Sequence, residues 1–91
     1  MSNIDTSPPT NEIQNLVAGG QFQEALDKLN KDNTQVSKRD YYYFKSVCYR
    51  YLKQSDKALL SLDQLVKYFP NYARAYQELG YIYSVQGDDK K

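Results

Sequence analysis

The segment Tyr76-x-x-Leu79-Gly80-x-x-Tyr83 combines an aromatic residue, a Leu-Gly pair and a second aromatic residue. In a helix these positions are i, i+3, i+4 and i+7, so they share one face. Two large rings then flank a residue without a side chain, which leaves a notch for the close approach of a neighbouring helix. The pattern predicts helix packing, and it offers no group for chemistry on a substrate.

A related pattern, Phe44-x-x-Val47-Cys48-x-x-Tyr51, occurs earlier in the chain. Its two aromatic residues match Tyr76 and Tyr83 in the same order and at the same spacing. In this register Cys48 takes the small, packed position that Gly80 takes in the later copy. The repetition predicts two helices of the same kind that lie side by side.

Each of these patterns belongs to a longer unit. Ala58 and Leu62 follow the turn after the middle copy, and Pro70 closes that unit. Ala25 and Leu29 repeat the spacing of Ala58 and Leu62, and they follow a glycine pair that makes the first turn. A helix pair of the same kind therefore precedes the other two units in the chain.

Over residues 10–89 the chain resembles the tetratricopeptide repeat family, with Tyr76 where that pattern usually has Trp. The resemblance implies an all-α fold of about two and a half repeats, in which five helices form antiparallel pairs stacked as a right-handed superhelix. Three features depart from the pattern. The turn of the middle copy, from Tyr51 to Ala58, is expected to be two residues shorter than the first, from Leu16 to Ala25. Ser37 stands where Pro70 closes the second unit, and the third unit has no second helix before Lys91.

We expect a disordered leader over 1–9, which is polar and proline-containing, before a single helical repeat domain over 10–91. Ser37 and Ser55 are the expected N-caps of two helices, and Gly87 is expected to end the last helix. No segment shows a strand signal that outweighs helical spacing. The helices are expected at about 10–18, 22–30, 39–53, 56–68 and 73–86.

The resemblance implies that the first helix of each pair lines the concave side of the array. We therefore expect a groove wall with positions spaced by three and four on the middle first helix, their equivalents in the later copy, and Gln14 and Val17 on the earliest helix. On the two later helices this predicted peptide-binding wall consists of Tyr42, Lys45, Tyr49, Leu52, Arg74, Gln77, Tyr81 and Ser84. Its rings offer contact area at low entropic cost, and its cations and amide can bond a peptide backbone or acidic side chains. The plain alternative is that all of these are ordinary exposed residues of a stacking module.

Two other binding modes fit the same residues less well. Some members of the family bind the C-terminal carboxylate of chaperones with a clamp of lysine and asparagine side chains. In this chain Tyr49 stands where the clamp needs asparagine. Lys45, Tyr49 and Lys53 could stack single-stranded bases, but a net charge of +1 argues against a nucleic-acid partner. A protein or peptide partner is the expectation.

Composition excludes several kinds of chemistry. Ninety-one residues allow one domain, and one cysteine without any histidine offers neither an internal disulfide nor a Cys/His zinc site. Cys48 has no histidine base, so we interpret it as a buried small residue rather than a nucleophile. Asp88 and Asp89 are interpreted as solvated acids. We expect no metal, no cofactor and no enzymatic activity.

The start of the chain has no basic segment followed by an apolar run, and no apolar stretch has the length of a membrane span. A cytoplasmic protein-interaction scaffold without a membrane partner is therefore the expected function.

The last expected helix is apolar on both sides, so a face with Leu79, Tyr83 and Ile82 would lie uncovered. One alternative is a homo-oligomer that covers this face. The other is an N-terminal docking or regulatory segment of a larger enzyme, such as a sulfotransferase or glycosyltransferase, which rests on family analogy alone.

Overall fold

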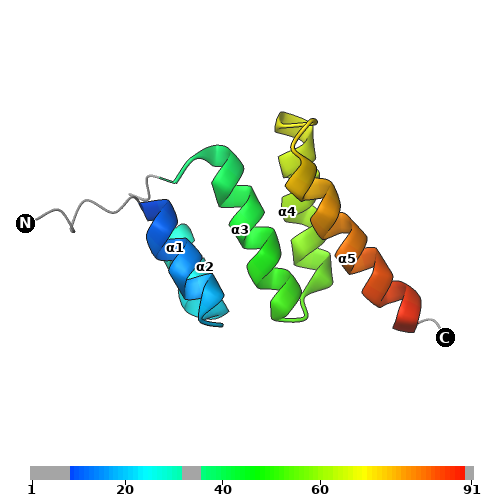
Figure 1. Cartoon of the computed structure of the whole chain (residues 1–91), viewed down its shortest axis with the longest axis horizontal. Coiled ribbons are helices and arrows are strands. Elements are labelled where there is room, and N and C mark those ends of the chain that lie inside the picture. Colours follow the sequence, from blue (N-terminus) through cyan, green and yellow to red (C-terminus); the bar gives the residue numbers. More distant parts are fainter. Residues whose placement is uncertain (1–8, 32–35, 90–91) are drawn as a thin grey trace, which may run out of the picture.

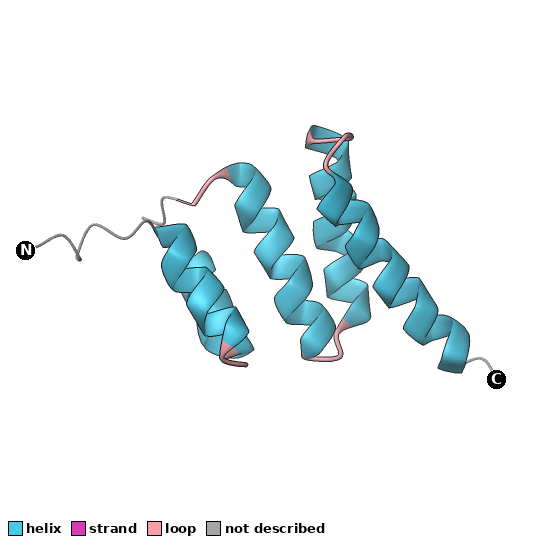
Figure 2. Ribbon diagram, in the orientation of Figure 1, coloured by secondary structure: helices cyan, strands magenta, loops and turns pink. Residues whose placement is uncertain are grey.

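The computed structural model describes residues 9–31 and 36–89, and within these ranges the chain forms α-helices and no strand (Figures 1 and 2). The all-helical fold is therefore confirmed for this part of the chain. The five helices are α1 (Pro9–Ala18), α2 (Phe22–Leu29), α3 (Lys38–Tyr51), α4 (Ser55–Tyr68) and α5 (Ala73–Asp89). The expected leader lies outside the described residues, apart from Pro9, which begins α1.

Successive helices run in opposite directions along an elongated array (Figure 1). α3 lies in the middle and packs against each of the other four helices. Two apolar clusters flank it. The first contains Ile13, Ala25, Leu26, Leu29, Phe44 and Cys48, and the second contains Ala58, Leu62, Leu65, Ala75 and Ile82. Tyr43 and Tyr49 of α3 pack against both clusters, so this helix joins the two halves of the array.

The helix ends agree only in part with the sequence signals. Ser37 caps α3 as expected, because its Oγ accepts a hydrogen bond from the Asp40 backbone N at 3.1 Å. Ser55 is the first residue of α4 rather than its cap, and Gln54 at the cap makes no side-chain bond there. The helix α5 continues through Gly87 to Asp89, because one glycine inside a helix costs only about 1 kcal/mol.

The turns after α1 and α3 have the same structure. Gly20 and Lys53 have positive φ angles of 81° and 67°. The next residue donates a backbone hydrogen bond into the preceding helix in both cases. Gln21 N bonds Leu16 O and Gln54 N bonds Tyr49 O, each at 2.8 Å. The first two units are therefore equivalent in the register that pairs Gly20 with Lys53.

Lys53 holds a left-handed conformation that a side chain disfavours, and this predicts a stabilising substitution. We expect Lys53→Gly to raise the free energy of unfolding by about 0.5–1 kcal/mol, because glycine takes this conformation without the Cβ clash. Urea titration measures the change. Lys67→Gly, which lies inside α4, is the control and should lower stability by about 1 kcal/mol. A loss of stability in Lys53→Gly would contradict the prediction.

Burial shows that α3 and α5 correspond in a different register from the predicted one. The buried residues near the middle of α5 are Glu78 and Ile82, and the predicted register pairs Ile82 with Arg50, which is not fully buried. A register moved by two positions pairs Cys48 with Ile82 at 0% and 1% exposure, and Phe44 with Glu78 at 8% and 4%. The predicted register is therefore wrong, and a move of two positions turns a helix face by about 200°.

The corrected register shows which face of α5 lies open. The matching positions are Tyr42, Ser46 and Tyr49 on α3, and Tyr76, Gly80 and Tyr83 on α5. The two α3 tyrosines pack against the cluster that α4 builds, and Ser46 is fully buried. Tyr76 and Tyr83 are 50% and 57% exposed.

The expected packing notch at Gly80 is thus present, but none of the described residues fills it. A Cβ placed on Gly80 would meet no heavy atom within 4 Å. Leu79 is half-buried. Ile82, which was expected on the uncovered face, is buried instead, since it faces inward into the second cluster.

Candidate functional site

An open groove of about 400 Å³ runs between the turn after α1, the middle of α3 and the facing side of α5. The residues that line it are Val17, Ala18, Gly20, Phe22, Tyr43, Val47, Arg50, Tyr51 and Glu78. On α3 the lining residues fall at i, i+4, i+7 and i+8, which is one face of a helix. The groove is therefore a property of helical spacing on α3, closed at its sides by its neighbours in the array.

A buried ion pair joins α3 to α5 at the groove. Arg50 Nε donates to Glu78 Oε1 at 2.7 Å, and Arg50 Nη2 donates to Oε2 at 3.3 Å. The side chains of Arg50 and Glu78 are only 20% and 5% exposed. Burial opposes the charge on Arg50, but the hydrogen bond and charge of Glu78 outweigh it and raise the pKa of Arg50.

Aromatic rings hold the same guanidinium from two sides. The Arg50 guanidinium carbon lies 4.4 Å from the ring centroid of Tyr51 and 4.9 Å from that of Tyr81. Tyr51 in turn stacks on Phe22, with ring centroids 4.6 Å apart and planes 1° from parallel. Although Tyr51 is 51% exposed, it is therefore fixed between α2 and Arg50. Side chains of three helices thus form one connected cluster.

Tyr43 forms the other end of the groove. Its ring meets Tyr72 edge-on at 5.9 Å, and the Arg74 guanidinium carbon lies 5.7 Å from its centroid. Burial raises the pKa of the Tyr43 phenol, and the negative charge of Glu78 raises it further. The hydroxyl therefore stays protonated at neutral pH and can act as a donor or an acceptor toward a ligand.

The α5 half of the predicted groove wall lies near these residues. Arg74 is exposed and its guanidinium lies against the ring of Tyr43. The ring of Tyr81 lies against the guanidinium of Arg50. Gln77 Nε2 donates to the Tyr81 hydroxyl at 3.2 Å. Ser84, also predicted for the wall, is exposed farther along α5.

The α3 half of that predicted wall lies on other faces of the helix. Tyr42 stacks on Tyr68 of α4, with ring centroids 6.3 Å apart, and packs against the second apolar cluster. Tyr49 packs against both clusters, and Lys57 Nζ of α4 lies 5.9 Å from its ring centroid. These two tyrosines serve the α3–α4 contact.

Lys45 and Leu52 are also turned away from the groove. Lys45 Nζ donates to the Tyr41 hydroxyl at 3.1 Å, and Leu52 packs against the first apolar cluster. The structure therefore does not bring the four predicted α3 residues together with the four on α5. Neighbours of the predicted positions, namely Tyr43, Arg50 and Tyr51, face α5 instead.

Sequence reasoning missed most of the groove because of the register error. The missed lining residues on the helices are Ala18, Phe22, Tyr43, Val47, Arg50, Tyr51 and Glu78. The available signal was the pair Gly20 and Lys53, each just before the glutamine that precedes the next helix. Matching Gly87 to this position, rather than matching the aromatic residues, pairs it with Lys53 and gives the register that the structure shows.

Cys48 is fully buried, and this makes a direct prediction. Burial raises the pKa of its thiol to about 12, so almost no reactive thiolate forms in the folded protein at pH 8. We expect a disulfide reagent such as Ellman's reagent to release no colour from the folded chain within minutes and to react fully in denaturant. A rapid reaction of the folded chain at pH 8 would show that the burial of Cys48 is transient.

The two arginines at the groove differ in how far their charge is available to a ligand. Arg50 is already neutralised by Glu78, and Arg74 presents an exposed positive charge beside half-buried rings. Within the described residues no group of three His, Cys, Asp or Glu side chains could hold a metal ion. In the same part of the chain, no helix is both long and apolar enough to cross a membrane.

Comparison with known proteins found no matching family model, no matching curated protein and no matching solved structure.

Proposed function

We propose that this chain is a protein-interaction scaffold of the tetratricopeptide repeat kind, which binds a peptide segment of a partner in the groove between α3 and α5. Antiparallel helix pairs with equivalent turns at Gly20 and Lys53 support the repeat assignment. Ala25 and Leu29, which are completely or almost completely buried, match Ala58 and Leu62 in the next unit.

The arrangement around Arg50 is the observation that carries this proposal. Glu78 fixes the guanidinium through two hydrogen bonds, and the rings of Tyr51 and Tyr81 lie against it. Rings that are already held in this way lose little conformational entropy when a ligand binds to them. Tyrosine and arginine are also the residue types that most often dominate binding energy at protein interfaces.

The free groups of the groove indicate the ligand's chemistry. Phe22 and Tyr51 line the groove as a stacked pair, so they offer the apolar edges of their rings to an apolar or aromatic side chain. Arg74 and Gln77 are exposed at the α5 side and can bond backbone carbonyls or a carboxylate. The best ligand is therefore a short peptide with an apolar anchor next to an acidic residue.

Selection of peptides from a displayed random library, followed by calorimetry with the purified chain, tests the proposal. We expect selected peptides to lose about tenfold or more in affinity for Tyr81→Ala, because its ring lies against Arg50 of the groove and an interface tyrosine that contacts the ligand typically contributes at least this much. Tyr83→Ala is the matched control, because Tyr83 is similarly exposed on the same helix but lines a different open space, beside Leu79.

Circular dichroism of both variants should match the parent chain, since both rings are about half exposed. Equal affinity of the peptides for the parent chain and Tyr81→Ala would rule out the groove. Equal losses in Tyr81→Ala and Tyr83→Ala would point to a change in the helix rather than to a lost contact.

A further inference from the structure

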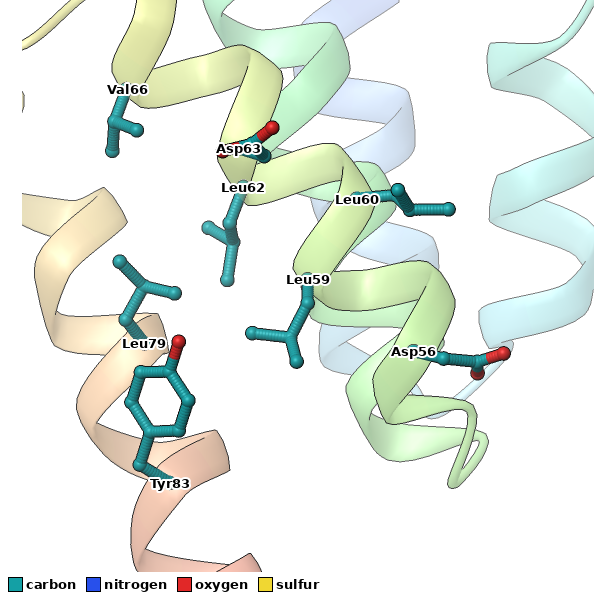
Figure 3. A pocket seen from close by; sticks show the side chains of 8 residues that line it. All are labelled: Asp56, Leu59, Leu60, Leu62, Asp63, Val66, Leu79 and Tyr83. Carbon is teal, nitrogen blue, oxygen red and sulfur yellow. The ribbon is translucent and has the colours of Figure 1, made fainter.

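We propose that the outer face of α5 and the adjoining edge of α4 form a second docking surface, which takes an amphipathic helix with basic flanks from a partner protein. We call this surface the helix seat. Its lining includes Asp56, Leu59, Leu62, Asp63, Leu79 and Tyr83 around an open space of about 350 Å³, and Tyr76 and Gly80 continue the same face of α5. Figure 3 shows Leu59 and Leu62 extending from α4 and Leu79 extending from α5 into the gap between the helices.

Internal equivalence shows that this face has the form of a covered one. Ile13 on α1, Ser46 on α3 and Gly80 on α5 occupy the same position in successive units. Ile13 is 2% exposed and packs in one cluster with α2, and Ser46 is fully buried. Only Gly80 lies open among these three positions, with no heavy atom within 4 Å of its Cβ site.

The helices that cover the earlier positions show what the seat accepts. α2 buries Ala25 and Leu29 completely or almost completely, and α4 does the same with Ala58 and Leu62. The alanine permits a close approach and the leucine four positions later fills the space beside it. A helix that fits the seat should carry the same Ala-x-x-x-Leu spacing.

The aromatic residues of the seat repeat those that α4 covers on α3. On α3 the ring of Tyr42 stacks on Tyr68 of α4, and Lys57 Nζ of α4 stands 5.9 Å from the Tyr49 centroid. Tyr76 and Tyr83 are the equivalents on α5, at 50% and 57% exposure. They offer an incoming helix the same ring surfaces. Tyr83 in particular can take a lysine that directly precedes the alanine of that helix, as Tyr49 takes Lys57.

Charge complementarity decides between a partner helix and a second copy of the chain. The charged residues that line the seat are Asp56 and Asp63, both exposed and both acidic. Two copies joined face to face would bring these carboxylates toward one another. A helix with lysine or arginine on its flanks would pair with them, so a basic partner helix is the better occupant.

The probe for a binding experiment comes from the chain itself. It is an acetylated and amidated peptide with the sequence of residues 54–69, in which Asp56→Lys and Asp63→Lys supply the basic flanks. The unaltered peptide is the charge control, and a Leu62→Asp version of the basic peptide is the packing control. We expect saturable binding of the basic peptide, weaker binding of the unaltered one and none of the Leu62→Asp version.

Gly80→Leu is the decisive variant of the protein. No heavy atom lies within 4 Å of a Cβ built on Gly80, so the new side chain starts into open space, and leucine is a better helix former than glycine. The folded state should therefore keep its stability while the seat is filled. We expect Gly80→Leu and Tyr83→Ala to lower the affinity for the basic peptide by about tenfold or more, and Tyr81→Ala to leave this affinity unchanged.

This pattern is the reverse of the one expected for groove ligands, so either proposal can fail alone. Unchanged affinity for Gly80→Leu, or no binding up to the solubility limit of the peptide, would overturn the helix seat. Equal binding of the basic and unaltered peptides would overturn its charge preference. If sedimentation shows a dimer of the free chain that Gly80→Leu dissociates, the occupant is a second copy and the proposed partner helix is wrong.

Discussion

Arg50→Ala is expected to lower the free energy of unfolding by about 3 kcal/mol, because it leaves Glu78 buried without its partner. Glu78 is only 4% exposed, and Arg50 is its partner in two hydrogen bonds that join α3 to α5. The same change removes the cation from between the rings of Tyr51 and Tyr81. Urea unfolding followed by circular dichroism measures the loss.

Arg39→Ala is the matched control for this prediction. Arg39 also lies on α3 and pairs with a carboxylate, Asp40, at 3.6 Å, but its side chain is 50% exposed. A pair of this kind contributes about 0–1 kcal/mol, since water solvates the half-exposed guanidinium and screens its attraction to the carboxylate. Equal losses of stability in Arg50→Ala and Arg39→Ala would contradict the view that burial is the reason why the Arg50 pair contributes more to stability.

A double replacement separates the cost of an orphaned charge from the value of the pair. Arg50→Met with Glu78→Leu removes both charges and keeps apolar volume, so we expect it to be more stable than Arg50→Ala by about 2 kcal/mol. If the double variant is as unstable as Arg50→Ala, the loss comes from packing around the rings rather than from the unpaired carboxylate.

The helical fold could be predicted because its signals are local. Apolar spacing, the Ser37 cap and the turn glycine at Gly20 each determine nearby structure, and all of them agree with the helices that form. The boundaries that were wrong lie where the signal is energetically small. The start of α4 differs from the expected one by a single residue, which is within the usual variation of helix ends, and Gly87 costs its helix only about 1 kcal/mol.

The groove could not be predicted to the same degree, because it depends on the relative rotation of α3 and α5. An error of two positions in the register turns the inferred face by about 200°. Tyr41, Tyr42 and Tyr43 are consecutive and chemically alike, so composition gave no sign of the error. Lys53 concealed the correct alignment, since it holds a left-handed turn that usually signals glycine.

Leu62→Ala is expected to lower the free energy of unfolding by about 3 kcal/mol. Leu62 is fully buried in the second apolar cluster, and its truncation removes apolar contacts and leaves a cavity that the fixed helices fill only in part. Leu60→Ala is the control on the same helix, because Leu60 is 68% exposed and should change stability by less than about 0.5 kcal/mol. Similar losses in the two variants would contradict the assigned inner face of α4.

Leu29→Ala extends this prediction to the way the array is held together. Leu29 is the equivalent of Leu62 in the preceding unit, is 1% exposed and belongs to the first cluster. The buried members of the two clusters do not overlap, and α2 and α4 are not in contact. The losses from Leu29→Ala and Leu62→Ala should therefore add within about 0.5 kcal/mol in the double variant. A larger departure would mean that Tyr43 and Tyr49, which touch both clusters, transmit the strain through α3.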